Sequence, residues 1–278
     1  MPASNFVVDV SLCTRCGLCV KDCPAKVIEQ LGKGVPSIPE RLAADCIECQ
    51  HCLAVCPVGA VSIFGLKPEN SAKLRAAGLP SLAQEELLAR GRRSVRQYHE
   101  KAVDKALVDR LLAATAHAPT GCNSRTLTFT LVDGRDAMKN LLERLVHALE
   151  NALHDGRVPE GLNFLAESVE AYRKNGEDPI FRSAPHLLIV SAPATSLCKD
   201  EDVAIALSYF ELLAASAGLG AGWCGFLKII LSVIPEFKKE LGIAEDAAFY
   251  GMLFGTPAVS YPRTVQRDAD LNIRRLNF

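Results

Sequence analysis

The chain has 278 residues, with 31 basic and 32 acidic side chains and a formal net charge of −1. This balance excludes the basic surface that nucleic-acid-binding proteins need to offset phosphate charges. Hydrophobic residues make up 49% and charged residues 23%, as in soluble globular proteins, and the length predicts about two domains. The start shows no secretory signal, and the most apolar long run, 203–223, is broken by Glu211 and by glycines. We therefore expect a cytoplasmic protein without a membrane span and without a nucleic-acid partner.

Two cysteine ladders dominate the first part of the chain. CTRCGLCVKDCP and CIECQHCLAVCP both read C-x2-C-x2-C-x3-C-P, the spacing of bacterial iron–sulfur ferredoxins, in which the last cysteine binds the other cluster. Structural zinc has no use for a third cysteine at this spacing, and disulfides do not suit a chain without an export signal. The expected ligands of two [4Fe–4S] clusters are Cys13, Cys16, Cys19 and Cys56 for one, and Cys46, Cys49, Cys52 and Cys23 for the other.

The repeat extends beyond the cysteines. FVVDV before the first ladder and VSIF after the second are strand-like, and Pro24 and Pro57 suit the first position of a helix. Residues 1–64 resemble a two-cluster bacterial-type ferredoxin domain. Because so small a unit has little core, bound metal is expected to supply much of its folding free energy.

The segment 65–85 is expected to be a linker, because prolines and glycines punctuate its short polar stretches. A helix capped by Ser81 is predicted from Leu82 to Gly91, and helical spacing predicts another over 103–117.

Strand and helix patterns alternate over the rest of the chain. LTFTLVD (127–133) alternates as a half-buried strand does, and APHLLIVSAP (184–193) reads as a buried strand. A buried apolar helix is expected over 203–217, and a terminal strand near 271–273. The pattern predicts an α/β or α+β layer domain over 86–278.

Four stretches in this region carry a family resemblance. They are RRSVRQYHEKAVDKALVDRLLAATAHAPTGCNSRTLTF, APHLLIVSA, GLGAGWCG and YPRTVQR. In this order they resemble the FMN-dependent nitroreductase family over about residues 88–275, and with the front domain its ferredoxin-fused branch. The resemblance implies an α+β protein whose second domain is an FMN-binding α/β sandwich, a homodimer with FMN at its interface, and NAD(P)H as a candidate donor.

The RRSVR stretch is the first candidate for the flavin site. Three guanidinium groups and a hydroxyl within five residues suit a phosphate and the oxygen-rich edge of a flavin, but also a solvated basic turn. The resemblance implies that Arg92 and Ser94 bind the FMN phosphate and that Arg96 contacts the flavin pyrimidine. All candidate cofactor residues are Arg92, Arg93, Ser94, Arg96, Asn123, Arg125, Cys224, Gly225, Arg263 and Arg267.

The other candidates follow from the later motifs. The resemblance implies that Asn123 meets the same flavin edge as the pyrimidine cation, and Arg125 adds a further cation where the family often has an aromatic residue. GLGAGWCG is implied to be a loop along the flavin ring, with Cys224 or Gly225 donating an N–H toward N5; a helix C-cap is the structural alternative. Arg263 and Arg267 are implied as late phosphate ligands, with Arg267 the better placed.

The variable segment contributes three aromatic residues, and three further cysteines lie outside the ladders. Phe164, Tyr172 and Phe181 lie where family members carry variable helices, and either stack on a planar substrate or belong to the helix core. The cysteines outside the ladders, Cys122, Cys198 and Cys224, have no ligand spacing and are interpreted as buried thiols.

Clusters carry one electron at a time, whereas FMN holds one or two. The sequence therefore predicts an oxidoreductase that passes electrons between two [4Fe–4S] clusters and FMN to reduce a nitroaromatic, a quinone or an activated double bond. No protein acid is evident as a proton donor, so no catalytic residue is assigned. The alternative is an electron-transfer module that relays electrons from flavin through the clusters to a partner protein; an iron–sulfur redox sensor with a vestigial flavin site is a third possibility.

Overall fold

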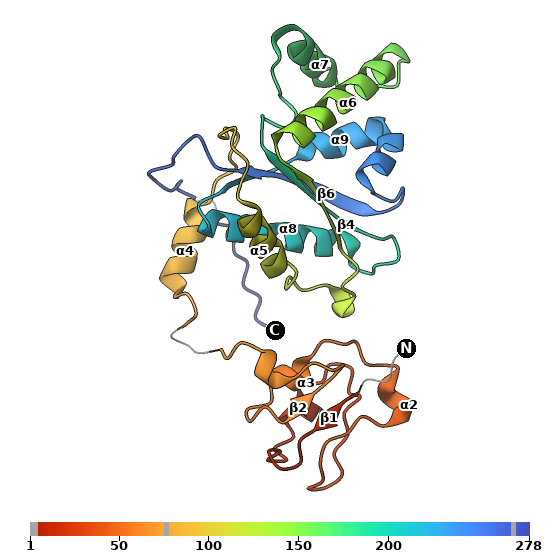
Figure 1. Cartoon of the computed structure of the whole chain (residues 1–278), viewed down its shortest axis with the longest axis vertical. Coiled ribbons are helices and arrows are strands. Elements are labelled where there is room, and N and C mark those ends of the chain that lie inside the picture. Colours follow the sequence, from red (N-terminus) through yellow and green to blue (C-terminus); the bar gives the residue numbers. More distant parts are fainter. Residues whose placement is uncertain (1–4, 75–77, 268–270) are drawn as a thin grey trace. The chain divides into compact units, whose positions relative to one another are not determined.

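The computed structural model describes residues 5–74, 78–267 and 271–278. The chain divides into two compact units, and each is described by itself (Figure 1). The first comprises Met1–Pro80 with Cys122–Ser124, and the second comprises Ser81–Gly121 with Arg125–Phe278.

The first unit is built around a two-stranded sheet and short helices. Strand β1 (Val7–Val8) pairs antiparallel with β2 (Val61–Ser62), so that the predicted strand edges on either side of the ladders are confirmed. The helices are α1 (Leu18–Lys21), α2 (Glu40–Ala43) and α3 (His51–Ala54), followed by the 3-10 turn η1 (Pro68–Asn70). The small core consists of Cys19, Val27, Ile28, Cys52, Leu53, Val61 and Ile63.

The expectation that Pro24 and Pro57 begin helices is wrong. The helix of each ladder lies earlier and contains its third cysteine, Cys19 in α1 and Cys52 in α3. Both prolines lie in turns, two residues beyond the helix C-caps. This is the position where proline cannot extend a helix, so each proline limits its helix to one turn.

The second unit contains a four-stranded antiparallel sheet. Its strands are β3 (Thr128–Asp133), β4 (His186–Ala192), β5 (Gly220–Trp223) and β6 (Ala248–Gly255), in the order β3-β4-β6-β5. The strands predicted over 127–133 and 184–193 are confirmed. Every residue of β4 is buried because this central strand is covered on both faces.

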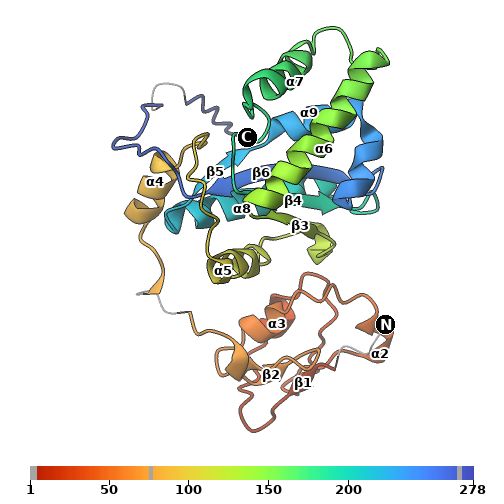
Figure 2. The same ribbon diagram turned by 45° about the horizontal axis from the view of Figure 1, so that its top comes forward.

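Helices cover both faces of this sheet (Figures 1 and 2). One face packs against α5 (Lys105–Thr115) and α8 (Lys199–Ser216), around Leu188, Val190, Leu207 and Phe210. The other packs against α6 (Arg135–His154), α9 (Gly225–Val233) and η4 (Pro235–Leu241), with α7 (Phe164–Asn175) beside α6. The predicted layered α+β domain is confirmed.

Polar caps fix several of the helix ends. Helix α4 (Leu82–Gly91) begins at a capping box between Ser81 and Gln84, which confirms the predicted bounds. Helix α5 begins at Lys105, two residues later than the expected range, because the Asp104 carboxylate accepts hydrogen bonds from the N–H groups of Ala106 and Leu107.

The expected strand near 271–273 is wrong, since residues 271–278 form no strand. A strand requires hydrogen-bonded neighbours, and the sheet of this unit is complete with four strands that lie earlier in the chain. Among the described residues, no helix combines the length and apolarity that a membrane span needs.

Candidate functional site

Cysteines of the two ladders lie near one another in the first unit. Cys13, Cys16 and Cys19 line one cavity together with Cys56, the last cysteine of the other ladder. In the second ladder, Cys46 lies within electrostatic reach of Cys49 and of Cys23, the last cysteine of the first ladder. The last cysteine of each ladder therefore lies beside thiols of the other ladder, and the role of these cysteines as ligands stays a prediction.

The raised pKa values of these thiols are consistent with a site for positively charged metal between them. Burial, together with the negative charges of Cys49 and Cys46, raises the pKa of Cys52 to about 12. Burial also raises the pKa of Cys19. Such crowded thiolates are stable together only with positive charge among them, which iron supplies.

Within the described part of the chain, no three His, Cys, Asp or Glu side chains converge on a single metal ion. A cubane spreads its four ligands over four irons, so wider spacing of the thiols is the expected geometry.

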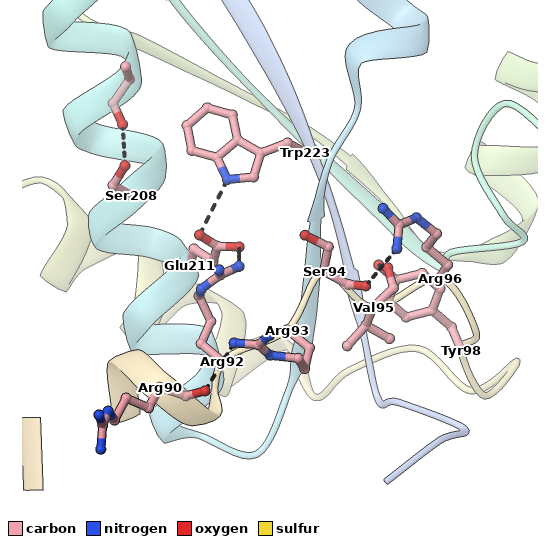
Figure 3. A network of polar contacts seen from close by, with 11 residues as sticks. Arg90, Arg92, Arg93, Ser94, Val95, Arg96, Tyr98, Ser208, Glu211 and Trp223 are labelled. Atoms are coloured by element: carbon pink, nitrogen blue, oxygen red, sulfur yellow. Dashed lines mark hydrogen bonds and ion pairs between the residues drawn. The ribbon is translucent and has the colours of Figure 1, made fainter. Parts of the chain in front are cut away.

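The RRSVR stretch of the second unit runs alongside β5. The Val95 N–H donates to the Ala221 carbonyl at 2.9 Å, and Ser94 forms a parallel bridge with Ala221. Figure 3 shows this extended stretch beside the strand, where Arg96 Nη1 donates to the Ser94 carbonyl at 3.3 Å. The stretch is a structured edge of the domain, because the sheet ladder continues onto it.

The glycines of GLGAGWCG make room for this neighbouring stretch. A Cβ on Gly220 would lie 2.7 Å from the Val95 side chain, and one on Gly222 would lie 2.9 Å from the Val95 carbonyl oxygen. Residues 220–223 form a strand and not the expected loop. Close packing against Val95 explains why two of these residues are glycines.

The helix C-cap considered for this motif is present as well. Gly218 has φ of 76° and follows the end of α8; its N–H bonds to the Ala215 carbonyl, and the Leu219 N–H bonds to the Ala214 carbonyl. This pair of bonds is a Schellman motif, which requires a left-handed residue where glycine has no steric cost. At the other end of the motif, the Cys224 N–H is engaged by the Gly251 carbonyl at 2.8 Å.

Arg92 and Trp223 meet at a buried acid, Glu211 of α8. The Glu211 side chain is 9% exposed; its Oε1 lies 2.8 Å from Arg92 Nη1, and its Oε2 accepts a hydrogen bond from Trp223 Nε1 at 3.3 Å. Figure 3 shows Arg92 and Trp223 reaching this carboxylate from two different segments. The buried charge is thereby both paired and hydrogen-bonded, as a carboxylate away from water must be.

A cavity of about 620 Å³ opens beside this group in the second unit. Its wall includes Arg92, Arg93 and Glu211, together with Ser260 and Tyr261 from the segment after β6. Arg93 Nη2 donates to the Arg90 carbonyl, but Arg93 Nε is buried and has no hydrogen-bond partner among the described residues. Two guanidinium groups and one unsatisfied buried donor beside a cavity fit an anionic ligand such as a phosphate.

The comparisons with known proteins agree with this architecture. Residues 89–256 match the nitroreductase family. The chain belongs to the nitroreductase family. Residues 12–61 match a 4Fe-4S dicluster domain, so this family member is an oxidoreductase with a ferredoxin-type iron–sulfur domain at its front. The comparison with curated proteins gives no match.

Solved structures share the fold of the nitroreductase domain. A nitroreductase with bound FMN from Bacteroides fragilis is 24% identical, with 70% of this chain and 100% of that chain covered and a TM-score of 0.55. One with bound FMN from Desulfitobacterium hafniense is 20% identical, with coverages of 68% and 96% and a TM-score of 0.52. An FMN-dependent nitroreductase from Clostridium difficile is 20% identical, with coverages of 69% and 99% and a TM-score of 0.51.

The remaining candidate residues of this nitroreductase-family chain are more scattered. Asn123 ends the turn η3 (Gly121–Asn123) with φ of 54°, and groups with the first unit. Arg125 belongs to the second unit, also with a left-handed backbone. Arg263 and Arg267 are exposed in a segment without regular structure, and neither lines the cavity. The roles of these four residues stay predictions.

The aromatic residues considered for substrate stacking pack mainly within the nitroreductase domain. Phe181 is fully buried in the core, and Phe164 packs edge-on against Phe226 with ring centroids 5.2 Å apart. Tyr172 lines a second cavity of about 480 Å³ between α6 and α7, where its hydroxyl donates to Glu143 at 2.9 Å. Tyr172 therefore lines a cavity, as stacking on a bound molecule requires.

The interpretation of the three other cysteines as buried thiols is wrong for Cys122. This residue is exposed because its left-handed turn, with φ of 51°, carries the side chain to the surface. Cys198 is half-buried, whereas Cys224 is fully buried. Burial raises the pKa of the Cys224 thiol to about 12, so it is an inert core residue.

Sequence reasoning missed the role of two buried acids on α8. Glu211 holds Arg92 and Trp223, and Asp202 accepts the Gly121 N–H at 2.8 Å and the Ser196 hydroxyl at 3.4 Å. For Glu211 the available signal was an acid within an apolar helical run, which marks a buried carboxylate that needs a partner. Asp202 lies among the acids of the first turn of α8, where no such signal sets it apart. The identity of those partners depends on the tertiary fold and could not be read from the sequence.

Proposed function

We propose that the chain is an FMN- and iron–sulfur-dependent oxidoreductase in which two [4Fe–4S] clusters exchange electrons with FMN. The acceptor is a small organic molecule: a nitroaromatic, a quinone or an activated double bond. The observation that carries the proposal is the pair of arginines at the cavity beside β5, with the unpartnered Arg93 Nε, in a chain of the nitroreductase family. The proposed domains are 1–64 for the clusters, 65–85 as a linker and 86–278 for FMN.

The cysteine groups support two clusters. Cys13, Cys16 and Cys19 share a cavity with Cys56, and Cys46 has Cys49 and Cys23 as its charged neighbours. The proposed ligands are Cys13, Cys16, Cys19 and Cys56 for one cluster, and Cys46, Cys49, Cys52 and Cys23 for the other.

The chain's own residues divide the work of binding the flavin. Arg92, Arg93 and Ser94 bind the phosphate, since paired guanidinium groups and a hydroxyl give the donors that a dianion requires. Arg96, with Arg125, stabilises negative charge at the pyrimidine edge. When bound, FMN supplies the exchange between one-electron and two-electron transfer.

The backbone around Gly225 positions the other edge of the flavin. The Cys224 N–H is engaged by Gly251, which favours Gly225 as the N–H donor toward the ring. Gly225 is the first residue of α9, where the N–H groups have no partners within the helix. Arg263 and Arg267 are the proposed late phosphate ligands, from the segment that follows Tyr261 of the cavity wall.

We also propose that the chain is a homodimer. Apolar residues lie on all sides of α8, and Tyr209 and Leu212 remain 43% and 36% exposed in the single chain. Leu82 and Leu87 of α4 and Leu271, Ile273 and Leu276 of the tail are exposed as well. A second copy covering these residues would remove apolar area from water, which is the dominant favourable term in association. The proposed location is the cytoplasm, where clusters are kept from oxidation.

The experiment mixes anaerobically purified protein with NADH and then NADPH, and follows the flavin absorbance. Bleaching identifies a nicotinamide-fed enzyme, and reduction by reduced ferredoxin but by neither nicotinamide identifies the clusters as the entrance for electrons. Multiple turnover with a nitroarene, a quinone or an enone then supports the enzyme. Reduction without turnover on any acceptor contradicts it and leaves the electron-transfer module, and protein without flavin contradicts both.

A further inference from the structure

Glu211 is a costly residue for its position. It lies in α8 between Phe210 and Leu212, and its side chain is 9% exposed. A leucine of similar volume would pack there without desolvating a charge, and buried ion pairs are often no more stabilising than apolar replacements. Helix stability alone therefore gives no reason for an acid at this position.

Both carboxylate oxygens of Glu211 are used to hold side chains of other segments. Oε1 lies 2.8 Å from Nη1 of Arg92, which follows α4, and Oε2 accepts from Trp223 Nε1 at 3.3 Å on β5 (Figure 3). The tryptophan is itself fixed edge-on against Tyr250, with ring centroids 5.3 Å apart. The carboxylate is therefore held from one side while it holds the arginine from the other.

We propose that Glu211 is a positioning residue for the phosphate of FMN, an inference that rests on the proposed function. An arginine has five N–H donors, and the contact with Glu211 engages Nη1. The Arg92 side chain is 25% exposed at the wall of the cavity, so its other donors are fixed where a phosphate can reach them. Arg93 is held in a comparable way through Nη2, by the Arg90 carbonyl.

The charge of Glu211 distinguishes positioning from simple electrostatics. A negative carboxylate near a phosphate dianion repels it, so removal of the charge alone would tighten FMN binding. Loss of the Glu211 contact frees a long side chain with many rotamers, and ordering it again on binding costs affinity. Positioning therefore predicts weaker FMN binding when the contact is lost, in spite of the repulsion that is relieved.

The test compares FMN with riboflavin, which has the same ring system but no phosphate. Full-length protein is freed of flavin with its clusters retained, and each flavin is titrated anaerobically by quenching of flavin fluorescence. The variants are Glu211→Gln, Glu211→Asp, Arg92→Ala and the double change Glu211→Gln with Arg92→Ala. The matched control is Glu201→Gln, which removes an exposed acid of the same helix.

We expect Glu211→Gln to weaken FMN binding about tenfold, in line with the ordering of one long side chain, and to leave riboflavin binding unchanged. Glu211→Asp keeps the charge but shortens the reach by one methylene, and we expect it to weaken FMN binding in the same way. Because Arg92 keeps a counterion in this variant, it also serves if the Gln variant does not fold. The double variant binds FMN no more weakly than Arg92→Ala. The control matches wild type.

Four results overturn the proposal. Equal weakening of FMN and riboflavin shows that Glu211 only supports the fold. Tighter FMN binding in Glu211→Gln shows that repulsion dominates, and unchanged binding in Glu211→Asp shows that reach is irrelevant. Additive losses in the double variant show that Glu211 does not act through Arg92. If the wild-type protein binds neither flavin, the proposed function itself is contradicted. The titration of the wild type alone distinguishes this outcome from the four above.

Discussion

The substitution Gly220→Ala tests the packing of the RRSVR stretch against β5. A Cβ at this position would lie 2.7 Å from the Cβ and from Cγ2 of Val95, and 2.8 Å from its Cγ1. Val95 is buried and its N–H is bonded to Ala221, so neither side can move away freely. Overpacking of this kind costs about 1–3 kcal/mol, and we expect the free energy of unfolding to fall by about 2 kcal/mol.

A second substitution tests whether Val95 is the cause. Val95→Ala alone removes two buried methyl groups and costs about 1.6 kcal/mol, at about 0.8 kcal/mol for each carbon. In the double variant the two close contacts with the Cγ atoms of Val95 are absent, whereas the 2.7 Å contact with the Cβ of residue 95 remains, so the overpacking is relieved in part. The double variant should therefore lose at least about 1 kcal/mol less than the sum of the single losses.

The single tryptophan, Trp223, lies on β5 itself and reports on this unit. Urea unfolding of each variant is followed by its fluorescence. The control is Gly91→Ala, because a Cβ at Gly91 meets no atom within 4 Å, and this variant should be neutral or slightly stabilising. A loss below about 0.5 kcal/mol in Gly220→Ala, or strict additivity with Val95→Ala, would refute the packing argument.

Two further predictions concern the clusters and a buried histidine. Cys13→Ala and Cys56→Ala should each remove the same one of two clusters, because both thiols line one cavity. Iron analysis of each variant should give about half the wild-type iron, and electron paramagnetic resonance of the two reduced variants should give the same signal. Different signals from the two variants would contradict the interleaved ligands. His186 is fully buried, its Nε2 accepts the Val103 N–H, and burial lowers its pKa below the ordinary 6.5. As the pH falls, this histidine therefore takes up a proton in the unfolded chain before it does so in the folded chain. The free energy of unfolding should fall as the pH drops below 6.5 and be restored above it. Urea midpoints at about pH 7.5 and about pH 5.5 measure this loss, which His186→Gln should reduce; an equal slope in that variant would assign the pH dependence to other groups.

Those elements whose signal is local were predictable from the sequence. The spacing within the first ladder indicated that Cys13, Cys16 and Cys19 lie together, and Ser81 with the residues after it indicated the start of α4. The buried run before Ala192 indicated the central strand. In each case neighbouring residues carry the information, through spacing, capping or burial on both faces.

Features that depend on distant segments were not predictable. Gly220 and Gly222 are glycines because Val95 packs against them from more than a hundred residues earlier in the chain. Glu211 is an acid whose partners lie on two other segments, and the proline positions were wrong because the ladder helices are only one turn long. Composition and periodicity describe one element at a time, whereas these properties arise from contacts between elements.

The exchange of electrons between the clusters and the flavin is the central claim, and stopped-flow spectroscopy tests it directly. Anaerobic protein is reduced with dithionite, excess reductant is removed, and a nitroarene is added while cluster and flavin absorbance are followed together. The same experiment uses Arg92→Ala, in which FMN binding is weakened and the cysteine ligands are intact. We predict that the clusters of the wild type reoxidise together with the flavin and that those of flavin-depleted Arg92→Ala stay reduced. Clusters that reoxidise equally fast without flavin, or that stay reduced while the flavin turns over, would contradict the account.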